Sequence, residues 1–123
     1  MYLDRRFPSA KLRAFLVELT SFKNSTWRQP YEIADADPFL SGYETARASL
    51  DASSHCLAYE LSRCTEEPTS FILRIEWDST EGHLQGFRRS PEFATFLAAV
   101  RPFINDIREM RHYALTSLVA RKA

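Results

Sequence analysis

Apolar and polar residues alternate along two segments in the middle of the chain, residues 56–63 and 71–77. A period of two is typical of β-strands that bury one face. An acidic turn containing Pro68 separates the segments, so the pattern predicts a β-hairpin. The predicted inner face is apolar and aromatic and comprises Leu57, Tyr59, Leu61, Phe71, Leu73, Ile75 and Trp77. The opposite face mixes charged and small residues, and we expect it to meet water or a partner sheet.

Helical spacing of apolar residues flanks this hairpin. Residues 38–52 carry such a stripe, and Asp37-Pro38 is expected to supply the N-cap and a proline at the first helical position. Residues 78–81 have the form of a capping box, which predicts a short helix that includes His83 and Phe87. Ser90-Pro91 restarts the helix, and Pro102 should end or kink it.

Two further strands complete the predicted domain. Residues 27–34 alternate, although Pro30 indicates an edge or irregular strand. Residues 110–115 form the closing strand. The order β-α-β-β-α-β predicts an α+β, ferredoxin-like fold, with a four-stranded antiparallel sheet and two helices on one face.

The chain of 123 residues is long enough for one domain. We assign residues 1–26 to an N-terminal extension with an amphipathic helix at about residues 9–22, residues 27–118 to the domain and residues 119–123 to a tail. The apolar stripe of the extension is Leu12, Phe15, Leu16, Leu19 and Phe22. A helix this short is marginal alone, so we expect it to pack on the domain or across a dimer.

Composition argues against several classes of partner. Sixteen basic and sixteen acidic residues give no net charge, which argues against nucleic acid and anionic membranes. No long apolar span or signal sequence is recognisable, so we expect a cytoplasmic protein. Cys56 and Cys64 lie roughly 26 Å apart along an extended strand at about 3.3 Å per residue, so they are expected to be free thiols. Neither a metal motif nor a phosphate-binding glycine loop is present, so we predict no metal and no nucleotide cofactor.

The order and spacing of several short segments resemble antibiotic biosynthesis monooxygenase domains, over roughly residues 27–116. These segments are residues 56–61, 76–79, 82–84, 90–93 and 110–113. The resemblance implies a dimeric α/β barrel, in which two sheets face each other in a homodimer and each subunit has its own pocket between sheet and helices. Characterised members oxidise electron-rich polycyclic phenols with O2 and without a cofactor, so it also implies a small aromatic substrate. Fold alone does not establish such chemistry.

The chain departs from this family at three positions. Anthrone oxygenases carry an asparagine where this chain has Leu73, a tyrosine where it has His83, and an arginine near Leu97. Haem-degrading relatives need a histidine where the chain has Phe96 and Leu97. The resemblance therefore places Leu73 and His83 at the pocket and leaves activity open.

Trp77 and His83 are the main candidate site residues. Trp77 is either a core anchor or a pocket wall on which a flat aromatic substrate stacks. His83 is either a histidine on the helix surface or the base that removes a phenolic proton, with a pKa near neutrality. Phe87 lies four residues after His83 and shares its helical face.

Three other residues are candidates for substrate binding. Tyr59 could donate a hydrogen bond to a substrate, or it could be a buried tyrosine bonded to the backbone. His112 and Tyr113 alternate on the last strand, so one of them faces the pocket. Arg88 and Arg89 are interpreted as a solvated helix break, with a smaller chance of holding an anionic ligand.

Three functions remain open. The first is a cofactor-independent monooxygenase that acts on a small quinol-like or polycyclic phenol. The second is a non-catalytic dimeric module that binds a small ligand, which the loss of the asparagine and arginine favours. Haem degradation ranks last. Dimerisation is expected through the sheet face that carries Glu60, Arg74 and Glu76, because their charges need partners.

Overall fold

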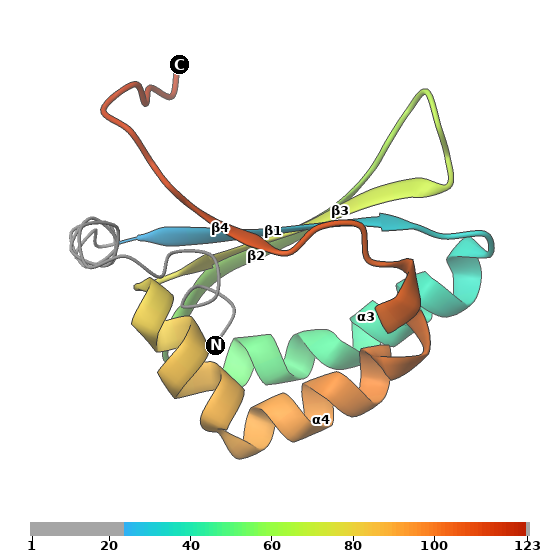
Figure 1. Ribbon diagram of the computed structural model, residues 1–123, viewed down its shortest axis with the longest axis horizontal. Coiled ribbons are helices and arrows are strands. Elements are labelled where there is room, and N and C mark those ends of the chain that lie inside the picture. The colour runs from blue at the N-terminus through green and yellow to red at the C-terminus, as the bar shows by residue number, and fades with distance from the viewer. Residues whose placement is uncertain (1–23, 123) are drawn as a thin grey trace, which may run out of the picture.

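The computed structural model describes residues 24–122, which form a sheet covered by helices on one face (Figure 1). The main elements are β1 (Ser25–Glu32), α3 (Ala36–Ala52), β2 (Cys56–Arg63), β3 (Ser70–Trp77), α4 (Pro91–Val100) and β4 (Arg111–Ala114). Shorter helical segments are η1 (Gly82–Gly86), η2 (Phe87–Arg89) and η3 (Arg101–Asp106). The helix predicted over residues 9–22 lies outside the described residues.

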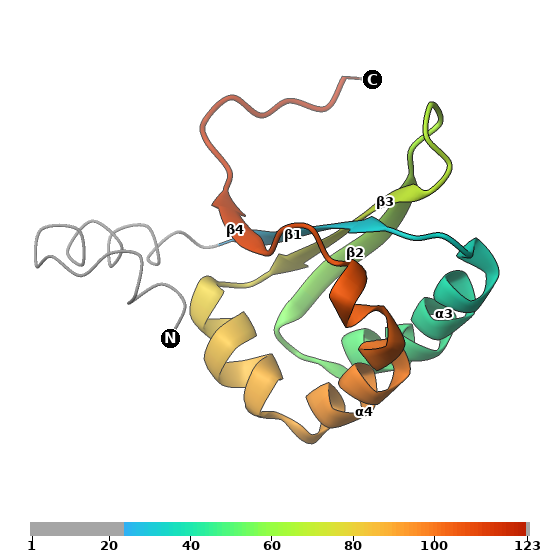
Figure 2. The ribbon, with the colours of Figure 1, turned by 45° about the vertical axis from the view of Figure 1, so that its right-hand side comes forward.

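The four strands form one antiparallel sheet in the order β2-β3-β1-β4. Both views place α3, α4 and the η segments on the same side of this sheet (Figures 1 and 2). The predicted α+β, ferredoxin-like fold is therefore confirmed. Its core is formed by the inner face of the sheet and the apolar stripes of the two long helices.

Burial along the strands follows the predicted alternation on β3 and departs from it on β2. Phe71, Leu73, Ile75 and Trp77 are all buried. On β2, a bulge between Cys56 and Ala58 shifts the register, so Cys56 pairs with Trp77 and packs against the core. Leu57, which was expected on the inner face, is 52% exposed. The prediction for Leu57 was wrong because a bulge adds one residue to the strand and turns a side chain away from its face.

Pro30 was expected to mark an edge or irregular strand, and the edge alternative was wrong. β1 lies inside the sheet and pairs with β3 along its whole length. Its pairing with β4 ends at Arg28, before Pro30 is reached. The Pro30 carbonyl accepts a hydrogen bond from the Arg108 amide, so this residue turns its backbone to the β4 side. An inner strand tolerates the proline because the β4 ladder has already ended where the N–H is missing.

Two predicted helix caps are displaced. α3 begins at Ala36 with Asp35 as its N-cap, two residues before Asp37. A proline fits within the first turn because the first four N–H groups have no partner inside the helix. After β3, the residue that caps is Ser79, whose Oγ accepts a hydrogen bond from the Gly82 amide at 2.8 Å. The Asp78 carboxylate instead pairs with His55 Nδ1 at 2.9 Å.

Other predictions about local structure are confirmed. α4 begins with Pro91 and ends at Val100, and η3 containing Pro102 follows it. Both cysteines are free. None of the helices within residues 24–122 is both long and apolar enough to cross a membrane.

Candidate functional site

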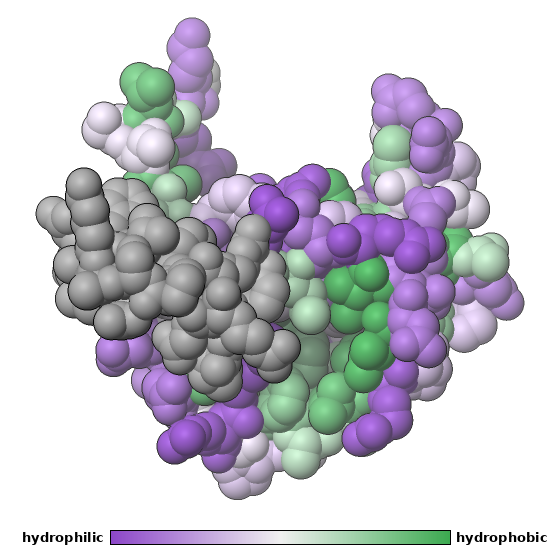
Figure 3. Space-filling model, in the orientation of Figure 1, coloured by the Kyte–Doolittle hydropathy of each residue, from purple (hydrophilic) through white to green (hydrophobic). Residues whose placement is uncertain are grey.

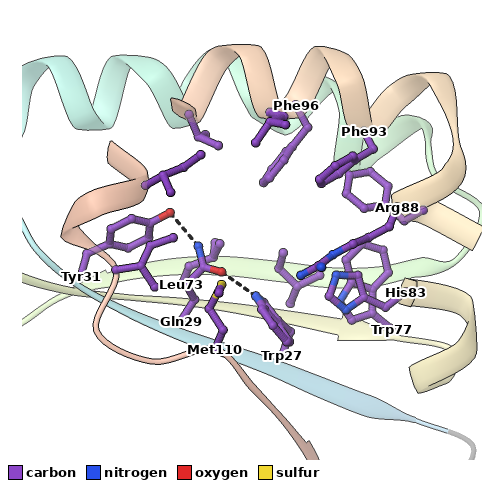
Figure 4. A pocket seen from close by; sticks show the side chains of 16 residues that line it. Trp27, Gln29, Tyr31, Leu73, Trp77, His83, Arg88, Phe93, Phe96 and Met110 are labelled. Carbon is purple, nitrogen blue, oxygen red and sulfur yellow. Dashed lines mark hydrogen bonds between the residues drawn. The ribbon is translucent and has the colours of Figure 1, made fainter. Parts of the chain in front are cut away.

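A cavity of about 320 Å³ lies between the inner face of the sheet and the helical layer. Apolar side chains gather in the hollow between these layers, and polar side chains border them (Figure 3). The lining residues are Trp27, Gln29, Tyr31, Leu73, Ile75, Trp77, His83, Phe87, Arg88, Phe93, Phe96, Leu97, Val100, Ile104, Ile107 and Met110. The walls are aromatic, and the few polar groups are placed at separate points (Figure 4). This composition is typical of a site for a small flat molecule.

His83 enters the cavity wall from η1, a single π-helical turn. The Phe87 amide closes this turn by bonding the Gly82 carbonyl, five residues earlier. On the other side of the turn, a Cβ on Gly86 would lie 2.4 Å from His55 Cδ2, so a larger residue there would have to displace the His55 side chain. Single π turns are frequent at functional sites, where they redirect a side chain.

The imidazole of His83 is only 3% exposed and lies between two indoles. It stacks on Trp77 with the rings 4.5 Å apart and 3° from parallel, and its edge meets Trp27 at 4.8 Å. Trp77 is fully buried, and its Nε1 has no hydrogen-bond partner among the described residues. The indole that stacks on the histidine therefore also carries a spare donor.

A second histidine lies behind the first. His83 Nδ1 is 2.8 Å from Nε2 of His112, which projects inward from β4 and packs 4.7 Å from Trp27. Burial, His112 and Arg88 lower the pKa of His83 to about 2. Burial and Arg88 lower the pKa of His112 to about 4. Both rings are thus neutral at pH 7, and the near-neutral pKa expected for His83 is not found in this structure.

Arg88 is the cationic side chain of the cavity lining. Its guanidinium points into the cavity beside His83 (Figure 4). It lies 5.5 Å from the Trp27 ring centre and 6.0 Å from that of Phe93, and it forms no ion pair or hydrogen bond with a described residue. Burial lowers its pKa. The prediction of a solvated helix break was wrong for Arg88, whereas Arg89 is exposed.

A hydrogen-bonded row of polar side chains runs from Trp27, beside His83, towards the opposite end of the cavity (Figure 4). Trp27 Nε1 donates to Gln29 Oε1 at 2.8 Å, and Gln29 Nε2 donates to the Tyr31 hydroxyl at 2.7 Å. The amide can take only this orientation, because the indole nitrogen is purely a donor and must face the amide oxygen. Tyr31 in turn shares a hydrogen bond with the Tyr43 hydroxyl. Burial raises the pKa of both tyrosines.

The structure brings most of the predicted site residues together. Trp77, Leu73, His83 and Phe87 line the cavity, and His112 contacts His83 from behind. The open choice on the last strand is settled by register: His112 pairs with Trp27 on the inner face.

Two predicted residues lie elsewhere. Tyr113 is 43% exposed and donates to the Glu109 carboxylate at 2.7 Å. The Tyr59 hydroxyl donates to Asp51 at 2.6 Å and accepts from Arg47 at 3.1 Å, outside the cavity. Tyr59 was expected to bond either to a substrate or to the backbone, and its partners are instead side chains of α3.

Sequence reasoning missed the contribution of β1. Trp27, Gln29 and Tyr31 share its inner face, and all three line the cavity. A glutamine between two aromatic residues on an otherwise apolar strand face was the available signal, because a buried amide needs partners. Gln29 stands directly opposite Leu73 in the register, so an amide is present beside the position where an asparagine is expected.

A metal centre has no support in this region. Within residues 24–122, no three His, Cys, Asp or Glu side chains gather in a way that suits a metal ion. The two histidines bond to each other and face an arginine, a cation that disfavours a second positive charge.

Comparison with known proteins agrees with this architecture. A Caulobacter crescentus protein, described as a candidate antibiotic biosynthesis monooxygenase, superposes with a TM-score of 0.68 at 16% identity, over 84% of this chain and 99% of its own. SnoaB, a cofactor-independent oxygenase from Streptomyces nogalater, gives 0.60 at 16% identity, over 82% and 96%. Identities this low show a shared fold.

Similarity in sequence is more specific. The uncharacterised protein YczJ of Bacillus subtilis is 27% identical over 75 residues, which cover 61% of this chain and 79% of YczJ. The model of the antibiotic biosynthesis monooxygenase family matches residues 35–99, more than half of the chain. That segment contains α3, the hairpin of β2 and β3, the π turn that carries His83, and most of α4. The chain therefore belongs to the antibiotic biosynthesis monooxygenase family.

Proposed function

We propose that this protein is a cofactor-independent monooxygenase that oxidises a small, flat quinol-like or polycyclic phenol with O2. The observation that carries the proposal is the pair formed by Arg88 and neutral His83 at one end of an aromatic cavity. A phenol donates an electron to O2 far more readily once it has lost its proton. Arg88 has no anionic partner among the described residues, and such a cation beside a largely apolar cavity favours that phenolate.

The other residues of the cavity support binding of a planar ring. Trp77, Phe87 and Phe93 provide flat faces against which an aromatic ligand packs. The volume of about 320 Å³ lies at the lower end of the range for ligand sites, which favours a small substrate.

The substrate itself can supply all the electrons. When a phenol becomes a quinone, one oxygen atom of O2 forms the new carbonyl. The two hydrogen atoms that the phenol loses leave as water with the second oxygen atom. This balance needs neither a flavin nor a metal, and SnoaB, which shares the fold, is a cofactor-independent oxygenase.

Oxygen uptake tests this function. The full chain, freed of flavin and metals, would be given a panel of quinols and anthrones while O2 is measured. We expect His83→Ala to lower kcat by roughly 10²-fold if His83 accepts the proton. Trp77→Phe should mainly raise KM, because it keeps an aromatic wall but loses contact area.

Arg88 has a matched control in its neighbour. Arg88→Gln should lower the rate because the phenolate loses the cation that stabilises it. Arg89→Gln removes an exposed charge and should change the rate little. Unchanged rates in both His83→Ala and Arg88→Gln, on a substrate that the wild type oxidises, would contradict the assignment of this end of the cavity as the reacting end.

A ligand-binding module without activity is the second candidate, and Leu73 favours it. This side chain is 2% exposed and lines the cavity at the position where anthrone oxygenases carry an asparagine. Saturable binding of an anthrone, seen as quenching of tryptophan fluorescence, with no O2 uptake would identify this function.

We also propose that two subunits pair through the outer face of the sheet. The helices lie on the other face (Figure 2). On the outer face, exposed Glu60 and Arg74 form a 3.2 Å ion pair with each other, so their charges do not need a partner subunit, and the proposal rests on the sheet face that the helices leave uncovered. The mass in solution decides this point, and a monomer at micromolar concentration would contradict it.

A further inference from the structure

The two histidines form a continuous connection from the cavity to the edge of the sheet. His83 lines the cavity and is 3% exposed. Its Nδ1 is bonded to His112 Nε2 at 2.8 Å, and His112 stands partly exposed on β4, the strand at the edge of the sheet. The Nε2 of His83 has no hydrogen-bond partner among the described residues. The atom available to a ligand and the atom bonded to His112 are therefore opposite nitrogens of one ring.

Hydrogen-bond accounting allows two arrangements of this pair. Both rings are neutral, so one nitrogen in the bond donates and the other accepts. If His83 Nδ1 donates, its Nε2 presents a lone pair to the cavity. If His112 Nε2 donates, His83 Nε2 carries a hydrogen and cannot take up a proton. The stronger base of the two accepts, and His112 is the less buried ring.

We propose that His112 is a positioning residue that makes His83 a competent base, because it takes the Nδ1 proton of His83 while His83 Nε2 takes the proton of the substrate. This inference rests on the proposed oxidation of a phenol. The phenolic O–H bond breaks as an N–H bond forms at His83 Nε2. In the same step the Nδ1–H bond of His83 breaks and an N–H bond forms at His112 Nε2. The products are a phenolate beside Arg88 and a cationic His112.

The surrounding groups favour transfer in this direction. Arg88, from η2, acts on both histidines, while Trp27 from β1 and Trp77 from β3 bring no charge to them. A proton that stayed on His83 would be almost fully buried. On His112 it has access to solvent, and burial lowers the pKa of His112 less than that of His83, so His112 is the stronger base of the two. His83 can therefore act as a base although its own pKa is low.

A measurement without substrate tests the arrangement of hydrogens. Nitrogen-15 NMR of the full chain with labelled histidine distinguishes protonated from unprotonated ring nitrogens. We expect His83 to be protonated at Nδ1 and unprotonated at Nε2 at pH 7, with a coupling across the bond to His112 Nε2. A hydrogen on His83 Nε2 in the ground state would overturn the proposal.

Variants of His112 separate proton transfer from simple support. His112→Gln can still accept a hydrogen bond from His83 Nδ1 but cannot take the proton, whereas His112→Phe can do neither. With anthrone as the probe, transfer predicts that both variants lose about 10-fold or more in kcat. A His112→Gln protein as fast as the wild type would show that His112 only orients His83 and would overturn the transfer step.

Tyr113→Phe is the matched control, since Tyr113 neighbours His112 on β4 but lies on the outer face. We expect it to keep the wild-type rate. Failure of the proposed function has a different signature. In that case the wild type consumes no O2 with any probe, and the NMR measurement still decides whether His83 presents a lone pair to the cavity.

Discussion

The two ends of the cavity bury polar groups in opposite ways. At one end, Gln29, Tyr31 and Tyr43 bond in a closed row that begins at Trp27, whose ring also meets His83 and Arg88. At the other end, Arg88 has no anionic partner among the described residues, and the Trp77 N–H has no acceptor there. One end therefore satisfies its own hydrogen bonds, and the other leaves donors and a cation available.

This difference separates stability from binding. A buried network that is fully bonded fixes side chains in one arrangement and costs the fold little. Unpaired buried groups cost free energy in the empty protein, and a ligand that pairs with them recovers it. We therefore expect changes at the tyrosine end to lower stability, and changes at the arginine end to alter binding and chemistry.

Acid should produce the largest effect, and it should act through the histidines. The pKa values of about 2 and about 4 for His83 and His112 lie below an unfolded value near 6.5, so the unfolded chain binds more protons. Stability is therefore lost as pH falls from about 6.5 towards 4, by about 3 kcal/mol per pH unit for the two groups together. Denaturant unfolding at pH 7, 5.5 and 4.5 measures this slope.

The double variant His83→Gln, His112→Gln should flatten the acid slope, and an unchanged slope would assign it to other groups.

The tyrosine end behaves oppositely. The folded state raises the pKa values of Tyr31 and Tyr43 above the unfolded value near 10. Their contribution to stability is therefore constant below about pH 10 and is lost as the pH rises above it. Acid and alkali should thus act on different ends of the cavity.

Breaking the closed row should cost less than acid but remain easily measured. Gln29→Leu leaves the Trp27 N–H unpaired and removes one of the bonds of Tyr31, which should cost about 1–3 kcal/mol of unfolding free energy. Gln85→Leu, at an exposed position, should stay within about 0.5 kcal/mol. Equal stabilities of the two variants would show that the row does not stabilise the fold.

Replacing Arg88 should change stability in the opposite direction. Arg88→Met replaces a desolvated charge with an apolar chain of similar length, so we expect unchanged stability or a gain of up to about 1 kcal/mol. Arg89→Met serves as the exposed control. A marked loss of stability in Arg88→Met alone would mean that the guanidinium supports the fold and would remove the contrast between the two ends.

A change outside the cavity should have the smallest effect. Tyr59→Phe removes hydrogen bonds to Asp51 and Arg47 at the surface and should alter stability by about 0.5 kcal/mol or less. The KM for an anthrone should not change. A raised KM would show that Tyr59 contacts the substrate.

The sequence by itself determined the order of elements, the buried face of β3 and the aromatic nature of the site. These features depend on neighbours along the chain: alternation on β3, a proline at the start of α4, and apolar residues at helical spacing. Trp77, His83 and Phe87 were found for the same reason, since they follow one another from the end of a strand into a helix.

Only the tertiary structure decided which polar groups meet. The sequence predicts that Arg88 is a surface residue, but η2 places its guanidinium over the ring of Trp27, a residue 61 positions away in the sequence. His112 meets His83 because β4 pairs with β1 and the π turn points the same way. The bulge in β2 moves Leu57 out of the core that alternation assigned to it. Such contacts depend on register and on single-residue irregularities, which contribute little free energy locally and are fixed by packing across the whole domain.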